Sequence, residues 1–151
     1  RTYGFNSKNL CQIFTPYNVA EMMAEIALHG AKESIDSRGY ISIQDPTLGA
    51  GVMLIAAAHV LSNSLKDGRN WQNHSLFVGQ EISTVAAQMA YIQLSLLGCA
   101  GYIKIGNSLT SPMKPDDCLE DYWFTPMYFG GVWQARRALN PSGILIDPYK
   151  K

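Results

Sequence analysis

Charged residues are scarce in this chain. Only 16% of the residues are charged, and the 12 basic and 12 acidic side chains cancel, whereas 47% of the residues are hydrophobic. This composition excludes a disordered chain and predicts a folded protein with a sizeable core. A free-standing DNA-binding protein usually carries a basic face, but the lysines and arginines here are scattered. Charge therefore gives only weak support to DNA as a partner.

Cysteines and metal-ligand spacings are also lacking. Cys11, Cys99 and Cys118 are odd in number and have no CxxC spacing, which predicts buried thiols and excludes a disulfide framework or a zinc site. The three histidines show neither metal-ligand nor catalytic-triad spacing, so we predict no metal site.

No apolar run reaches membrane-spanning length, and no signal peptide is visible. The apolar segment from Val52 is interrupted by His59 and followed by Ser62 and Asn63. We therefore expect a cytoplasmic protein without membrane contact. The sequence begins with Arg1 rather than methionine, which indicates processing or trimming of a longer chain.

Helical and strand-like patterns alternate over the first two-thirds of the chain. Thr15 and Pro16 are expected to begin a helix that Gly30 ends, and residues 31–39 to form a polar link. Strands are predicted at 40–44, 76–80 and 102–105, separated by helices at 50–65 and 83–98. The apolar faces expected on the first and last helices are Val19, Met22, Met23, Ile26 and Ala27, and Val85, Met89, Ile92 and Leu96.

This order predicts an α/β fold with a Rossmann-like parallel sheet flanked by helices. The pattern changes after Ser111, where residues 122–133 are dense in aromatic side chains. Residues 134–139 are expected to form a short helix and residues 144–146 a last short strand. We expect residues 1–151 to form one domain, with a binding half at 12–109 and an aromatic-rich tail at 110–151.

Polar side chains follow the three predicted strands at the point where each one ends. Asp45, Glu81 and Asn107 are expected to meet at one edge of the sheet, beside a loop that contains Gly49 and Gly51. Glycines there let the backbone approach a ligand closely, and a carboxylate can accept both hydroxyl groups of a ribose. The edge therefore predicts a site for an adenosine-type ligand.

Four short motifs occur in a fixed order along the first two-thirds of the chain. They are Phe14-Thr15-Pro16, Asp45-Pro46-Thr47-Leu48-Gly49-Ala50-Gly51, Gly79-Gln80-Glu81 and Gly106-Asn107-Ser108-Leu109. Through these motifs and their order, residues 12–109 resemble the N6-adenine DNA methyltransferases, particularly the modification subunits of type I restriction-modification systems.

The resemblance implies S-adenosylmethionine as the cofactor. It implies that Phe14, Thr15 and Pro16 cover the methionine end of the cofactor, and that the loop of Asp45, Pro46, Gly49 and Gly51 holds its amino-acid part. It further implies that Glu81 holds the ribose and that Asn107 lies beside the adenine. Taken singly, the same residues also have structural explanations, as turn residues or as the capped start of a helix.

The catalytic motif of that family, Asn/Asp-Pro-Pro-Tyr/Phe, is missing, and no Pro-Pro occurs in the chain. At a matching distance stands Phe124-Thr125-Pro126-Met127-Tyr128, so the candidate catalytic residues are Thr125, Pro126 and Tyr128. Asp147-Pro148-Tyr149 lies too far downstream. The residues after Leu109 are also too few for the remaining strands and crossovers of a complete methyltransferase sheet, so the sheet is expected to be shortened.

These features predict a DNA adenine-N6 methyltransferase family protein. The alternative is a catalytically degenerate relative that binds the cofactor, or a partner, without methyltransferase activity. A third hypothesis is a small-molecule or RNA methyltransferase that uses Thr125 and Pro126 differently. Because a shortened sheet has an open edge and little room for so many rings, residues 122–133 are expected to contact a second copy or another subunit.

Overall fold

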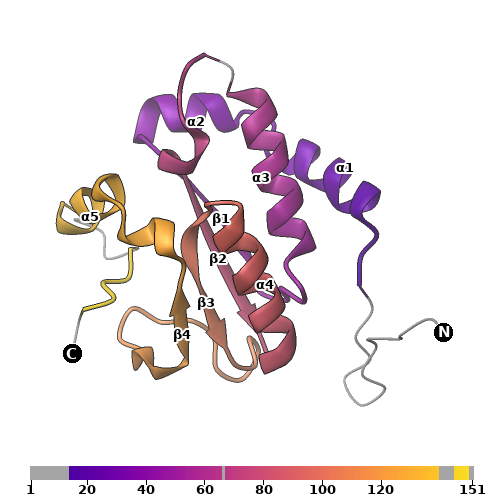
Figure 1. Ribbon diagram of the computed structural model, residues 1–151, viewed down its shortest axis with the longest axis vertical. Helices are drawn as coiled ribbons and strands as arrows, with labels where there is room; N and C mark the ends of the chain where they lie inside the picture. The colour runs from indigo at the N-terminus through magenta and orange to yellow at the C-terminus, as the bar shows by residue number, and fades with distance from the viewer. Residues whose placement is uncertain (1–13, 66, 140–144, 150–151) are drawn as a thin grey trace.

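A four-stranded sheet is the centre of the computed structural model, which describes residues 14–65, 67–139 and 145–149 (Figure 1). The strands lie in the order β1-β2-β3-β4. The strand bounds are β1 Ile41–Asp45, β2 Ser75–Glu81, β3 Ala100–Ile105 and β4 Tyr122–Phe124. The helix bounds are α1 Tyr17–Ala27, α2 Ala31–Arg38, α3 Val52–Ser64, α4 Thr84–Leu96 and α5 Gly131–Ala138, with short 3-10 turns η1 Trp71–Asn73, η2 Leu119–Asp121 and η3 Pro126–Phe129.

Strands β1, β2 and β3 are parallel, and the predicted α/β fold is confirmed. Asp45 aligns with Gly79 on β2, and Glu81 aligns with Ile105 on β3, so the carboxyl ends of the three strands meet at one edge. Among the described strands, β1 pairs only with β2 and therefore lies at the border of the sheet. β4 pairs with β3 in the antiparallel direction, which the sequence did not predict.

Helices α3 and α4 cover one face of the sheet, and α1 packs against α3 (Figure 1). The side of α4 that packs inward carries Ala86, Ala87, Ala90 and Leu94, and the inward side of α1 carries Ala20 and Ala24. Alanine lets a helix approach its neighbours closely, so these small residues form the buried side. The apolar faces expected from the sequence point the other way, and Met22, Ile26, Ile92 and Leu96 are exposed.

The opposite face of the sheet is covered by aromatic side chains from β4, η3 and α5. Tyr128 and Trp133 are fully buried, and the Trp133 indole Nε1 donates a hydrogen bond of 3.0 Å to the carbonyl oxygen of Gln72. Burial raises the pKa of Tyr102, beneath this layer, to about 12. The expectation of an exposed aromatic association surface is therefore wrong for Tyr122, Tyr128 and Trp133, because these rings form the second core of the protein.

Several local expectations also differ from the structure. The segment 31–38 is helix α2 rather than a polar link, and it begins and ends at left-handed glycines, Gly30 and Gly39. Leu145 and Ile146 form no strand, and Ile144 lies outside the described residues. Cys99 is buried as expected, with burial raising its pKa to about 12, but Cys118 is exposed. Within the described ranges, no helix combines the length and apolarity needed to cross a membrane.

Candidate functional site

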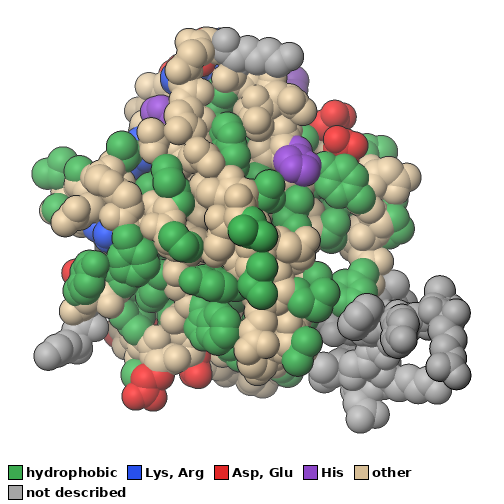
Figure 2. Space-filling model, in the orientation of Figure 1, with side chains coloured by type: hydrophobic (Ala, Val, Ile, Leu, Met, Phe, Trp, Pro, Cys, Tyr) green, Lys and Arg blue, Asp and Glu red, His purple; other side chains and the backbone are tan. Residues whose placement is uncertain are grey.

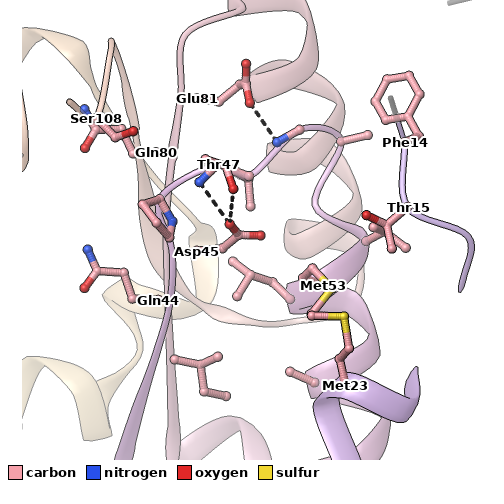
Figure 3. A pocket seen from close by; sticks show the side chains of 18 of the residues that line it. Phe14, Thr15, Met23, Gln44, Asp45, Thr47, Met53, Gln80, Glu81 and Ser108 are labelled. Carbon is pink, nitrogen blue, oxygen red and sulfur yellow. Dashed lines mark hydrogen bonds between the residues drawn. The ribbon is translucent and has the colours of Figure 1, made fainter. Parts of the chain in front are cut away.

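A cavity of about 840 Å³ opens at the carboxyl ends of β1, β2 and β3 (Figure 3). Its walls come from Phe14 and Thr15, from α1 and α3, from the loop after β1, and from the loops after β2 and β3. This size lies in the range of pockets that hold drug-sized ligands, about 300–1,000 Å³. The position also agrees with the rule that open α/β sheets bind ligands beyond the carboxyl ends of their strands.

Seven of the nine residues that the resemblance assigns to the cofactor line this cavity. They are Phe14, Thr15, Asp45, Pro46, Gly49, Glu81 and Asn107. Pro16 does not line it and is instead the N-cap of α1, where its carbonyl accepts hydrogen bonds from Val19 and Ala20. Gly51 also lies outside the cavity, because it packs against Ala90 of α4.

The two glycines of the loop after β1 have different surroundings. Both have a positive φ, 54° at Gly49 and 90° at Gly51, which favours glycine. A Cβ added at Gly51 would lie 3.0 Å from the Cβ of Ala90, so this glycine allows close packing against α4. A Cβ added at Gly49 would instead lie 3.9 Å from the ring of Phe14, on the cavity side. Of the two glycines that were expected to lie close to a ligand, only Gly49 therefore borders the cavity.

The Glu81 carboxylate connects this loop to the start of α4. One oxygen accepts a hydrogen bond of 2.7 Å from the Gly49 amide (Figure 3). The other accepts one of 2.8 Å from the Ser83 amide. Glu81 is only 6% exposed. A carboxylate has acceptor sites beyond these two, so it can hold the loop and still accept from ligand hydroxyl groups.

Asp45 holds the first turn of the same loop. Its Oδ1 accepts hydrogen bonds from the amide of Thr47 at 2.9 Å and from the Thr47 hydroxyl at 3.3 Å. Its other oxygen has no hydrogen-bond partner among the described residues. The cavity thus contains two carboxylates at neighbouring strand ends, which is suited to a ligand with cationic and hydroxyl groups.

The loop after β3 forms a third wall of the cavity. Asn107 accepts hydrogen bonds through Oδ1 from the amides of Leu109 and Thr110, at 2.9 and 3.3 Å. Gln80, which is 2% exposed, donates a hydrogen bond of 2.8 Å to the carbonyl oxygen of Ser111. Asn107 therefore shapes its own turn, and Gln80 holds that turn against the sheet.

Comparison with known proteins identifies the family to which the chain belongs. A family model described as N-6 DNA methylase matches residues 3–143. The chain belongs to the N-6 DNA methylase family. Its structure also matches the crystal structure of a modification subunit of a type I restriction enzyme from Vibrio vulnificus, with 25% sequence identity and a TM-score of 0.51. The match covers 70% of this chain and 22% of that subunit, so this methylase-family chain spans about a fifth of its solved relative.

The candidate catalytic residues of this methylase-family chain lie away from the cavity. The Thr125 hydroxyl donates a hydrogen bond of 2.7 Å to the Cys99 carbonyl and accepts one of 3.0 Å from the Gly101 amide, at the start of β3. The cavity lies at the other end of β3. Thr125 is 1% exposed, and the Tyr128 hydroxyl donates to the carbonyl of Ile146. Because β4 is antiparallel, the structure brings neither these residues nor Pro126 to the edge of the sheet that carries the cavity.

Several residues that line the cavity were not among the site residues expected from the sequence. They are Met23, Gln44, Thr47, Met53, Gln80 and Ser108. Thr47, Gln80 and Ser108 belong to the quoted motifs without an assigned role, and Gln44 directly precedes one of them, so their position was a usable signal. Met23 and Met53 come from helices, and their apolar character alone indicates a core position as readily as a cavity wall. In the described part of the chain, no group of three or more histidine, cysteine or acidic side chains is arranged to hold a metal ion.

A buried ion pair fixes the far end of the loop after β3. Lys104 is 4% exposed, and its Nζ lies 2.5 Å from Asp117 Oδ2 and 3.2 Å from the Pro112 carbonyl oxygen. The Tyr122 hydroxyl donates a further hydrogen bond of 2.7 Å to Asp117. The hydrogen bond from Lys104 holds the pKa of Asp117 below its usual range. The pair therefore anchors the segment that follows the cavity wall.

Lys104→Met is expected to lower the free energy of unfolding by about 1.5–3 kcal/mol, the range for hydrogen bonds to charged groups. Because the folded-state pKa of Asp117 is depressed, the stabilisation is complete above the ordinary aspartate pKa of about 3.9 and is lost as the pH falls through the folded value. Urea unfolding between pH 3 and 7 measures this. Lys114→Met, which removes the same charge from an exposed side chain, is the control. Equal stability of the two variants would show that the pair contributes nothing.

Proposed function

We propose that this chain binds S-adenosylmethionine in the cavity at the carboxyl ends of β1, β2 and β3. The observation that carries the proposal is the convergence of Asp45, Gly49, Glu81 and Asn107 on one cavity of about 840 Å³. In this proposal Phe14 and Thr15 cover the methionine end, Asp45 and Gly49 face the amino-acid part, Glu81 holds the ribose and Asn107 lies near the base.

The polar and apolar side chains of the cavity fit such a cofactor. Ribose hydroxyl groups and an ammonium group are hydrogen-bond donors, and the carboxylates of Asp45 and Glu81 are acceptors at adjacent strand ends. The Phe14 ring and the side chains of Met23 and Met53 supply an apolar wall for the remainder. When bound, S-adenosylmethionine supplies an activated methyl group.

We further propose that the chain alone does not methylate adenine in DNA. Methylation of a base amine requires a base removed from the duplex stack and acceptors that bind its amine. Thr125, the residue at the matching position, donates and accepts hydrogen bonds within the protein at the opposite edge of the sheet. Net charge is zero and the lysines and arginines are scattered along the sequence, so charge gives little support to DNA binding by the chain alone. DNA and partner subunits belong, in this proposal, to a larger assembly that contains this fold.

Calorimetric titration with S-adenosylmethionine, and with its demethylated product, tests binding. We expect a dissociation constant in the micromolar range, equivalent to about 8 kcal/mol. Absence of heat and of thermal stabilisation at millimolar ligand would contradict the proposed binding.

Transfer of labelled methyl groups to duplex DNA tests the second part, and we expect no incorporation above background from the chain alone. The positive control is a DNA adenine methyltransferase of known activity in the same assay. Robust incorporation into adenine would overturn this part and leave the proposed binding intact.

A further inference from the structure

The outward face of α4 is apolar along its whole length. Val85, Ile92 and Leu96 are 65%, 56% and 83% exposed, and Met89 lies between them on the same side. Hydrophobic side chains gather across the face of the molecule where α4 lies (Figure 2). We call these four residues the α4 stripe. Contiguous exposed apolar surface of this kind marks an association site.

The α4 stripe has the spacing of a coiled-coil seam. Its members are separated by four, three and four residues, which is the repeat of the a and d positions in a heptad pattern. Such a seam is shaped to interlock with another helix rather than with a sheet or a flat surface. The spacing therefore defines the kind of structure that covers it.

The helix that carries the stripe contains no charged residue. Thr84–Leu96 has no aspartate, glutamate, lysine or arginine, and the exposed residues beside the stripe include Gln88 and Gln93. A solvent-facing helix surface normally carries charges. Without charges, two identical faces meet without repulsion, and no oppositely charged partner is favoured over a second copy.

The stripe is also symmetric about its centre. Reversing a spacing of four, three and four gives the same spacing, so an antiparallel copy sets Val85 against Leu96 and Met89 against Ile92, twice each. In a two-fold interface, residue i contacts residue j while j contacts i, and this pattern meets that condition with an apolar residue at every position.

We propose that α4 is the interface of a homodimer, in which the stripes of two copies pair antiparallel about a two-fold axis. This association does not depend on the proposed cofactor. It places the interface on α4 rather than on the aromatic residues 122–133, most of whose rings are buried in the second core. The surface area buried by one helix pair is small compared with the roughly 1,200–2,000 Å² buried in stable interfaces, so a micromolar dissociation constant is expected.

The dimer interface also lies beside the cavity. Ile82, just before α4, is 51% exposed and lines the cavity wall next to Glu81. In an antiparallel pair, the end of one α4 lies near the start of the other. The second copy therefore approaches the rim of each cavity.

Sedimentation equilibrium of the full chain from about 1 to 200 μM tests the proposal. We expect a monomer of 16.7 kDa at the lowest concentration and a mass approaching twice that value at the highest. Ile92→Glu is expected to weaken association at least tenfold. The matched control is Ile26→Glu on α1, which adds the same charge at an isoleucine that is 71% exposed and should leave association unchanged. A wild-type monomer at every concentration, or equal effects of the two variants, would overturn the proposal.

A pair of oppositely charged substitutions distinguishes antiparallel pairing of the α4 stripes from non-specific hydrophobic association. Val85→Lys and Leu96→Glu are each expected to yield a monomer, because each places a charge in the apolar seam. The double variant is expected to recover the dimer, since each lysine then faces a glutamate of the other copy. The two positions are separated by three helical turns, about 16 Å, so they do not pair within one chain. A double variant that remains monomeric while circular dichroism shows it to be folded would contradict the antiparallel pairing.

Discussion

Replacing Gly49 with leucine is expected to weaken binding of S-adenosylmethionine about 100-fold while the protein stays folded. Gly49 lines the cavity, and a side chain there would start 3.9 Å from the Phe14 ring and extend into the space between the loop and that ring. Loss of about 3 kcal/mol of binding energy corresponds to a 100-fold weaker dissociation constant. Calorimetry with S-adenosylmethionine measures the effect.

The control for this variant is Gly68→Leu. Gly68 also has a left-handed φ, 87°, and no atom lies within 4 Å of an added Cβ. It therefore shares the conformational cost of a side chain in that region, about 1–2 kcal/mol, without any contact with the cavity. Weakened binding in both variants would show that backbone strain, and not the lost space at Gly49, is responsible.

Glu81→Ala is expected to lower both stability and cofactor affinity. The alanine leaves the amides of Gly49 and Ser83 without their acceptor, and a hydrogen bond to a charged group contributes about 1.5–3 kcal/mol. Stability is expected to fall because Glu81 is buried and holds two backbone amides rather than lying free in solvent at a strand end. We expect a lower melting temperature together with a 10- to 100-fold weaker dissociation constant.

Two measurements separate the roles of Glu81. The melting temperature without ligand measures how much the hydrogen bonds of Glu81 stabilise the loop. Calorimetry at a temperature where the variant is fully folded measures its affinity for the cofactor. Glu25→Ala, an exposed acid on α1, should change neither quantity. If Glu81→Ala unfolds earlier but binds the cofactor as tightly as the wild type, the carboxylate is only a structural brace.

The sequence predicted the first three strands and their common edge because each strand is followed by a recognisable polar or glycine signal. It did not predict which side of α4 is buried. Hydrophobicity favoured Ile92 and Leu96 for the core, whereas contact between elements depends on size and selected Ala86, Ala87 and Ala90. Periodicity alone does not separate a face that packs within the chain from one that is free to pack against another chain.

The direction of β4 was not predictable for a different reason. Three residues are too few to show a pattern, and the end of β4 is held to β3 by the Thr125 hydroxyl, which bonds to Cys99 and Gly101. Gly101 has no room for a side chain, since an added Cβ would collide with the backbone of Phe77. These are long-range contacts between residues distant in sequence. The role of Gly51 was missed likewise, because its neighbour Ala90 belongs to a later helix.

Because β4 runs antiparallel to β3, sequence changes at the two ends of β3 are expected to have different effects. At the start of β3, the Gly101 amide donates a hydrogen bond to Thr125, next to the aromatic core, and at its end Gly106 borders the cavity. Sequence changes at the first end act on folding, and changes at the second act on what the protein recognises. Selection for a new ligand can therefore change the loops after β1, β2 and β3 while the residues at the aromatic end stay the same and keep the protein folded.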